Sequence, residues 1–171
     1  MANTPSTNHC LETGKPCSLC CKLIGVAPLK KPRYQWCSHC TSTGCGIYAD
    51  RPEDCKDFEC IWLATQVTKS PLPKELKPSI CGAIIGGTVD GKQMVVHLND
   101  GTDWRKGTLG QFIKFTSAHT DVIIRHRYHI LVIAGNRIVG EDTDLAVTPE
   151  NHIGHYEVTL FPPEQWVKAV P

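Results

Sequence analysis

Long apolar stretches are missing from this sequence. No run approaches the roughly 20 apolar residues that cross a bilayer, and the segment from Met1 to Lys15 is polar, without the apolar centre of a secretory signal peptide. We therefore expect no membrane partner and a cytoplasmic location. Because thiols stay reduced in the cytoplasm, this expectation decides how the cysteines are interpreted.

An excess of charge is missing as well. The 171 residues carry 18 Lys and Arg against 17 Asp and Glu, a formal net charge of +1, so no overall field attracts nucleic acid. The sequence also has no nucleotide-binding glycine loop, no Gly-x-Ser-x-Gly elbow and no His-Glu-x2-His. It therefore names no catalytic residue and leaves open whether the protein is an enzyme. An unknown protein or small molecule remains as the expected partner.

Cysteine, in contrast, is abundant and concentrated. Eight of the 10 cysteines lie in the stretch that begins at residue 17 and ends at residue 60. Disulfide-rich secreted domains are usually short and carry a signal peptide, and inert buried thiols would be spread along the chain. Clustering and x2 spacings are typical of metal ligands. We expect the metal ligands to be Cys17, Cys20, Cys21, Cys37, Cys40, Cys45, Cys55 and Cys60.

The adjacent pair Cys20-Cys21 bears on the number of metal sites. Neighbouring residues rarely both point into one tetrahedral site, so the pair indicates two nearby sites, a shared cluster, or one ligand beside a bystander. Eight thiolates complete two closed Zn²⁺ sites, in which the metal stabilises the fold. The alternative is iron, held as an iron–sulfur cluster or as the centre of an oxidoreductase or modification enzyme.

Other residues near the cysteines are weaker candidates. His39 lies between Cys37 and Cys40 and either binds metal or donates a hydrogen bond to a ligand. Cys10, in the polar tail, is either an extra ligand or an ordinary thiol. The basic segment 30–33 is interpreted as charge compensation, since four thiolates and one Zn²⁺ carry a net charge of −2.

Two sequence blocks resemble a known family. The blocks are Cys17-x2-Cys20-Cys21 and Cys45-x-Ile47-Tyr48-x2-Arg51-Pro52-x2-Cys55-x2-Phe58. They are similar to the YkgJ-like group, a CxxCxxCC domain described as zinc- or iron-chelating. The resemblance covers about a quarter to a third of the chain, and it implies metal chelation through about eight cysteines.

The chain departs from the family pattern at one position. The first cysteine of CxxCxxCC falls on Gly14, which has no side chain to bind metal. Either Cys10 substitutes for it, or Cys37 and Cys40 complete the set. Arg51, which matches the family's Arg-Pro, is expected to neutralise the thiolates or to form a capping salt bridge.

The segment that begins at Pro52 predicts a helix. Pro52 suits a first helical turn, and Phe58, Ile61, Trp62 and Thr65 repeat at intervals of three and four. Cys55 and Cys60 then lie on one helix but point in different directions, so we expect them to serve different sites.

The second half of the chain has a different composition. A proline-containing linker at 69–73 separates a cysteine-rich metal-binding lobe, residues 1–68, from a mainly antiparallel β-sheet portion, residues 74–171. Asp90-Gly91 predicts a hairpin turn, residues 109–119 a helix capped by Thr108, and residues 163–170 an amphipathic turn that packs Trp166 on the sheet. The fold class expected is α+β, with one or two helices on the sheet.

Histidines and aspartates of this half are given ordinary roles. A strand over 121–133, divided near residues 127–128, places His126 and His129 on opposite sides of the sheet. We interpret them as partly exposed strand residues. Asp100, Asp103 and Asp121 lie near predicted turns, where aspartate forms local hydrogen bonds.

Overall fold

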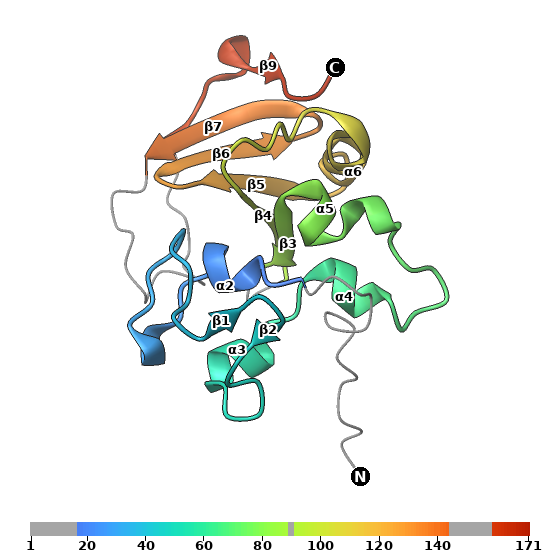
Figure 1. Ribbon diagram of the computed structural model, residues 1–171. Helices are drawn as coiled ribbons and strands as arrows, with labels where there is room; N and C mark the ends of the chain where they lie inside the picture. The colour runs from blue at the N-terminus through green and yellow to red at the C-terminus, as the bar shows by residue number, and fades with distance from the viewer. Residues whose placement is uncertain (1–16, 89–90, 144–158) are drawn as a thin grey trace.

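The structure, a computed structural model, describes residues 17–88, 91–143 and 159–171. A cysteine-rich N-terminal lobe contains a small two-stranded sheet and is followed by a larger, mostly antiparallel sheet with helices (Figure 1). The predicted α+β class is thereby confirmed.

The lobe consists of short elements joined by turns. Its helices and strands are α2 (Cys20–Leu23), η1 (Ala27–Leu29), β1 (Cys40–Thr41), β2 (Gly44–Cys45), α3 (Glu53–Asp57) and α4 (Ile61–Thr65). Helices of four or five residues have little stability of their own. Contacts with the rest of the molecule must therefore hold them in place, and Leu23 of α2 and Trp62 of α4 are buried.

The single helix predicted after Pro52 is wrong, because the chain bends between α3 and α4. Phe58 and Cys60 are extended, with ψ of 116° and 151°. The bend has a physical reason: α3 buries none of its residues, whereas α4 buries Trp62 in the core. Packing of Trp62 thus outweighs the modest gain from continuing a surface helix.

The larger sheet has seven strands among the described residues, in the order β3-β4-β5-β6-β7-β8, with β9 also pairing with β7. The strands are β3 (Ala83–Gly87), β4 (Gln93–Leu98), β5 (Asp121–His126), β6 (His129–Ala134), β7 (Arg137–Thr143), β8 (Thr159–Leu160) and β9 (Val167–Lys168). All pairs are antiparallel except β4 and β5, which are parallel. Parallel neighbours need a crossover, and α6 (Gly107–Thr116) lies in this connection.

The hairpins follow their turn residues. Gly135 and Asn136 have φ of 53° and 58° between β6 and β7, which is the left-handed pair that a type I′ turn requires. Thr88 donates its backbone N–H to the Gln93 carbonyl at 2.9 Å, which closes the β3–β4 hairpin. Part of the predicted Asp90-Gly91 turn lies outside the described residues.

The β5–β6 hairpin corrects the prediction for its histidines. The chain reverses at residues 127–128, as expected, with Arg127 in the left-handed region at φ 52°. His126 and His129 are therefore direct partners across two strands. Directly paired residues project from the same face of a sheet, so the prediction of opposite faces is wrong.

Helix α6 begins two residues earlier than predicted and ends at Thr116. Its N-cap is Lys106, without a side-chain cap, so the predicted capping role of Thr108 is wrong. Gly110 in the first half of the helix lies close to the preceding loop. A Cβ atom on Gly110 would lie 2.4 Å from the Arg105 carbonyl oxygen, so only glycine lets the helix approach the preceding loop this closely.

The C-terminal segment forms a short helix and a strand. Helix η4 (Pro163–Gln165) precedes β9, which pairs with β7. The residue predicted to pack on the sheet, Trp166, is partly exposed. Ala169 and Val170 are the residues of this segment that are buried. The Trp166 indole instead donates to the Phe161 carbonyl at 2.9 Å.

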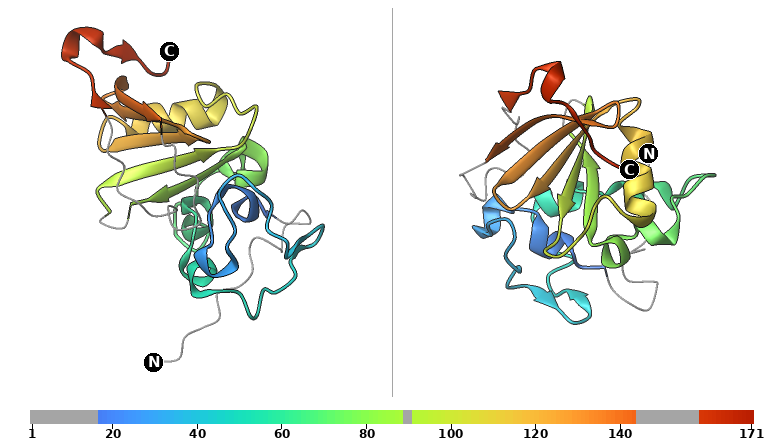
Figure 2. Two further views of the ribbon diagram at one scale, coloured as in Figure 1. Left: turned by 90° about the vertical axis from the view of Figure 1, so that its left-hand side faces the viewer. Right: turned by 90° about the horizontal axis from the view of Figure 1, so that it is seen from above.

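One hydrophobic core joins the lobe to the sheet. Leu23 and Trp62 from the lobe belong to the same buried cluster as Ile84, Val96 and Ile113 from β3, β4 and α6. Each such side chain contributes about 1.5–3 kcal/mol when it leaves water. Figure 2 shows the lobe beside the β3–β4 end of the sheet and α6 along the sheet. No described helix is long and apolar enough to span a membrane.

The remaining helices link the lobe and the sheet. Helices η2 (Lys74–Leu76) and α5 (Pro78–Cys81) occupy the connection after the predicted linker. Helix α5 ends at Gly82, whose φ of 71° suits a left-handed C-cap. A Cβ atom there would collide with the Thr102 hydroxyl at 2.3 Å, and this hydroxyl donates to the Gly82 carbonyl at 3.0 Å.

Candidate metal centre

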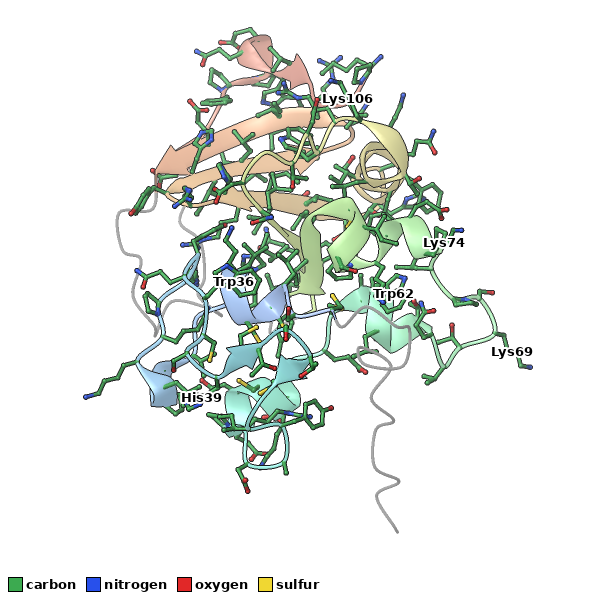
Figure 3. All side chains as sticks on the ribbon, in the orientation of Figure 1. Trp36, His39, Trp62, Lys69, Lys74 and Lys106 are labelled. Carbon is green, nitrogen blue, oxygen red and sulfur yellow. The ribbon has the colours of Figure 1, made fainter. Side chains whose placement is uncertain are left out.

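Six of the eight predicted cysteine ligands line one cavity of about 320 Å³ in the lobe. They are Cys17, Cys20, Cys21, Cys37, Cys45 and Cys55. Figure 3 shows sulfur atoms gathered around β1 and β2. Much of the remaining wall is apolar, formed by residues such as Ile24, Val26, Leu29, Ile47, Phe58 and Leu63. Cysteines from several separate segments thus meet at one place.

Backbone hydrogen bonds bring the first two cysteine groups together. Helix α2 carries Cys20 and Cys21, and the Cys21 carbonyl accepts the N–H of Cys37 at 2.8 Å. The N–H of Cys40 in turn donates to the Cys37 carbonyl at 3.0 Å. This tight turn places the second x2 pair directly beside the end of α2.

The β1–β2 ladder adds Cys45. Cys40 and Cys45 are direct partners in this ladder, beside the pair Thr41 and Gly44. Gly44 has a φ of 120°, which residues with a side chain rarely adopt. Gly46 donates its N–H to the His39 carbonyl at 2.8 Å. The two glycines that bracket Cys45 therefore serve the sharp turn, as the sequence indicated.

Cys21 has a lowered pKa. A hydrogen bond with the Cys20 thiol lowers the pKa of Cys21 from 9.0 to about 6, against burial, which raises it. A hydrogen bond with Cys40 and the positive charge of Lys31 lower it further. Cys21 is therefore mainly thiolate at pH 7, which is the form that binds metal.

Two neighbouring thiols are shifted in the opposite direction. Burial raises the pKa of Cys40 and of Cys55, and the negative charge of Cys21 adds to both shifts. Cys37 acts on both groups, and Cys45 acts on Cys55. These mutual effects show that the thiols lie close enough to repel one another once ionised. A bound cation would relieve that repulsion.

Lys31 is a buried cation beside this group of thiols. Its side chain lines the cavity and the residue is only 5% exposed. The ammonium group donates to the carbonyl oxygens of Lys22, at 3.1 Å, and Ile24. Burial lowers the pKa of Lys31 to about 8, against the thiolates of Cys37, Cys21, Cys20 and Cys55, which raise it. Lys31 is thus the residue of the basic segment 30–33 that lies where it can compensate the charge of the thiolates.

Cys60 lies apart from the cavity. It is buried at the N-cap of α4, and burial raises its pKa, with a further contribution from the charge of Cys17. Cys55 lies near Cys21, Cys37 and Cys45, whereas Cys60 lies near Cys17. The two cysteines do not share the one helix that the sequence had predicted.

Cys81 is a residue that sequence reasoning left out. Its thiol donates to the Leu76 and Ala83 carbonyls at 3.5 and 3.4 Å. Burial raises its pKa, and the charge of Cys17 adds to the shift. No spacing pattern connects Cys81 with the cysteine stretch, because α4, η2 and part of α5 lie between them. Only the packing of α5 against the lobe reveals the proximity.

The other candidates have different surroundings. The Arg51 guanidinium lines the cavity, stacks 3.8 Å from the centre of the Tyr48 ring, and donates to the Tyr48 carbonyl at 3.3 Å. His39 is half-buried and is not part of the cavity wall. The predictions for Cys10 and Gly14 concern residues outside the described part of the chain.

The described thiols are not arranged around one position that a metal ion could occupy. Within residues 17–88, 91–143 and 159–171, no three or more His, Cys, Asp or Glu side chains are arranged as a metal site. The nine cysteines described there also form no disulfide bond. What the structure establishes is a cavity lined by six cysteines and by the buried Lys31.

Comparison of the chain with models of protein families, with curated proteins and with solved structures found no match.

Proposed function

We propose that the lobe binds a thiophilic metal ion, with Zn²⁺ as the first candidate. The observation that carries this proposal is the meeting of six cysteines from separate segments at one cavity. Thiolate sulfur is a preferred ligand of Zn²⁺, and the lowered pKa of Cys21 provides a thiolate at neutral pH. The similarity of the cysteine blocks to the YkgJ-like group supports the same reading.

The proposed ligand set remains the predicted one: Cys17, Cys20, Cys21, Cys37, Cys40, Cys45, Cys55 and Cys60. Binding requires several of these thiols to turn about their Cα–Cβ bonds towards a shared ion, which moves them between ordinary rotamers. Lys31 would offset part of the negative charge of a four-thiolate site. A cytoplasmic location, which keeps thiols reduced, belongs to the same proposal.

Elemental analysis tests the proposal. The chain is purified anaerobically without a histidine tag, and its metal content is measured together with its absorption spectrum. We expect one or two zinc ions per chain, lost with chelator together with a large fall in thermal stability, because metal-binding free energy is folding free energy in such sites. A folded, heat-stable and metal-free protein would contradict the proposal.

Two cysteine variants sharpen the result. Cys45→Ser removes a thiol that lines the cavity, and we expect it to lower both zinc content and melting temperature. Cys81→Ser is the control, because Cys81 lies outside the cavity wall and binds backbone carbonyls. Equal zinc loss in both variants would point to misfolding rather than to ligation.

A second candidate is an iron–sulfur or iron-dependent enzyme. The observation that favours it is the size of the cavity, about 320 Å³, which is about ten times the roughly 30 Å³ of a water molecule in the liquid. A closed Zn²⁺ site needs no such space, whereas a multi-atom cluster in apolar surroundings does. Brown anaerobic protein that bleaches with dithionite would favour this candidate, and a colourless preparation containing zinc would exclude it.

A further inference from the structure

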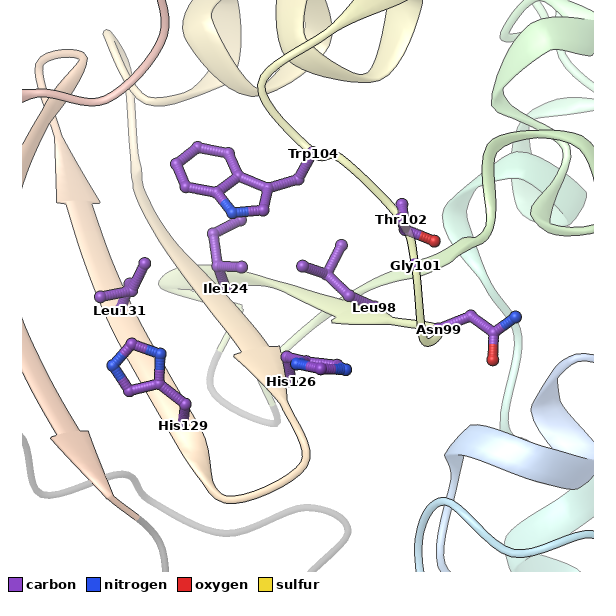
Figure 4. A pocket seen from close by; sticks show the side chains of 9 residues that line it. All are labelled: Leu98, Asn99, Gly101, Thr102, Trp104, Ile124, His126, His129 and Leu131. Carbon is purple, nitrogen blue, oxygen red and sulfur yellow. The ribbon is translucent and has the colours of Figure 1, made fainter.

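A second cavity, of about 200 Å³, lies on the sheet, and none of the described residues that line it is a cysteine. Strand residues such as Leu98 and Ile124 give it an apolar floor, and His126 and His129 stand at one side (Figure 4). No lysine, arginine or carboxylate is among the described residues of its wall. The two imidazoles therefore supply the only ionisable groups of this wall.

The two histidines are placed to meet one ion. His126 ends β5, His129 begins β6, and the two are direct partners across the hairpin. Direct partners project from the same face of a sheet, with Cβ atoms about 4.5–5.5 Å apart. Nδ1 lies two bonds beyond Cβ, so both Nδ1 atoms can approach one ion to the usual metal–imidazole distance of about 2.0–2.1 Å. In Figure 4, one nitrogen of the His129 ring faces His126.

Contacts on the far side of each ring leave Nδ1 as the metal-binding nitrogen. Nε2 of His126 lies 3.1 Å from Oδ1 of Asp100, and Nε2 of His129 lies 3.5 Å from Oε2 of Glu141. A carboxylate only accepts hydrogen bonds, so these contacts place the hydrogen on Nε2 and a lone pair on Nδ1. Within the described part of the chain, neither Nδ1 has a hydrogen-bond partner. Metal-binding histidines share this pattern, because their second nitrogen commonly donates to a carboxylate.

The His126 ring is held before any ion binds. Its partner Asp100 accepts two hydrogen bonds from Arg127, at 2.8 and 2.7 Å, and lies 3.3 Å from the Lys22 ammonium. The buried Tyr34 ring meets the His126 ring edge-on, with 6.2 Å between the ring centres. A ligand that is already oriented loses little freedom on binding.

The surrounding charges do not oppose a cation. Lys22 and Arg127 are balanced by Asp100 and Glu141, and neither cation lines the cavity. Among the described residues, no third His, Cys, Asp or Glu side chain completes a metal site here. Water must therefore fill the other positions of a bound ion, as it does in open metal sites.

We propose that His126 and His129 chelate a divalent transition-metal ion through their Nδ1 atoms at the mouth of this cavity. Imidazole nitrogen suits Zn²⁺, Ni²⁺ and Cu²⁺, and the cavity leaves room beside the ion for water or a small ligand. The site uses no cysteine, so it is independent of metal binding by the lobe.

The test is a titration of the whole protein with Ni²⁺, followed by NMR of the imidazole nitrogens and the Trp104 indole N–H. Ni²⁺ is paramagnetic and broadens the signals of nearby groups. We expect the signals of His126 and His129 to broaden together, before those of the other histidines, and the Trp104 signal to broaden with them because Trp104 lines the same cavity. Excess Zn²⁺, which is diamagnetic, should shift the Nδ1 signals of the same two rings more than their Nε2 signals.

Three results of this titration would overturn the proposal. The first is no change at either histidine with about 1 mM Ni²⁺. The second is a rise of Ni²⁺–thiolate absorption without a response of the histidines, which would assign the binding to the lobe alone. The third is a Zn²⁺ shift larger at Nε2 than at Nδ1.

Matched variants test chelation by the pair. His126→Gln and His129→Gln should each weaken Ni²⁺ binding at this site about tenfold or more, and by as much as the double variant, because the second imidazole binds an ion already held by the first. His119→Gln, beyond the end of α6, is the control and should leave binding unchanged. Additive losses in the two single variants, or an equal loss in the control, would show that the histidines do not act as one site.

Discussion

The ammonium of Lys22 lies 3.3 Å from the carboxylate of Asp100 and so ties the cysteine lobe to the sheet. Lys22 directly follows Cys21 in the chain, and Asp100 also binds Arg127 and His126 from the β5–β6 hairpin. A single aspartate thus connects the residue after Cys21 with the β5–β6 hairpin. These contacts are partly exposed, so each is individually weak and their combination is what matters.

Replacing this aspartate should loosen the junction. We expect Asp100→Asn to lower the melting temperature by about 2–4 °C at neutral pH and low salt, with a smaller effect at high salt. Asp103→Asn is the control, since the polar contacts of Asp103 with described residues stay within its own turn, through Lys106 and the Arg105 N–H. It should leave the melting temperature unchanged, and an equal loss in both variants would contradict a special role for Asp100.

The same contact predicts a dependence on acid. The hydrogen bond from Arg127, followed by that from His126, lowers the pKa of Asp100 from its ordinary 3.8. A carboxyl group with a depressed folded-state pKa stabilises the protein above its unfolded pKa and loses this contribution as the pH falls. The difference in melting temperature between wild type and Asp100→Asn should therefore shrink below about pH 4, and a difference that grows there would refute this account.

Cys21 should be the first cysteine to react with an alkylating reagent. With a pKa of about 6, roughly nine tenths of it is thiolate at pH 7, whereas Cys40 and Cys55 have raised pKa values. Brief treatment of chelator-treated protein with iodoacetamide, followed by peptide mass spectrometry, should show Cys21 labelled first. Its rate should fall by half near pH 6. Preferential labelling of Cys55 would show that this order is incorrect.

Lys31 should contribute to that reactivity. Removing its charge with Lys31→Met takes away a cation that lowers the pKa of Cys21, so labelling of Cys21 at pH 6 should slow by about two- to tenfold. Lys30→Met is the matched control, because the neighbouring Lys30 carries the same charge on an exposed residue that does not line the cavity. Comparable slowing in both variants would mean that a general charge effect, and not the buried ammonium, is responsible.

Gly110 should tolerate no side chain. In Gly110→Ala, the new methyl group would lie 2.4 Å from the Arg105 carbonyl oxygen, and we expect a loss of about 1–3 kcal/mol of stability, as for other overpacked sites. Gly86→Ala offers a control, because its added Cβ meets no heavy atom within 4 Å among the described residues beyond Gly86 and its chain neighbours. Denaturant unfolding of both variants measures the difference, and an equally stable Gly110→Ala would show that the loop moves aside easily.

Local patterns sufficed for several features of this protein. The glycines around Cys45 act over a few residues, so the sequence predicted correctly the sharp turn there. The strand alternation, the turn at residues 127–128 and the change of composition after the linker predicted the α+β class for the same reason. Whether the cysteines bind metal is a chemical inference from thiols, and it stays a prediction.

Tertiary structure decided the features that depend on distant residues. The bend between α3 and α4 exists because Trp62 packs in a core built largely from the sheet. The parallel pairing of β4 with β5 and the proximity of Cys81 to Cys17 both join segments far apart in the chain. Periodicity within one segment carries no information about which other segment lies beside it. Packing, which minimises exposed apolar surface over the whole molecule, supplies that information.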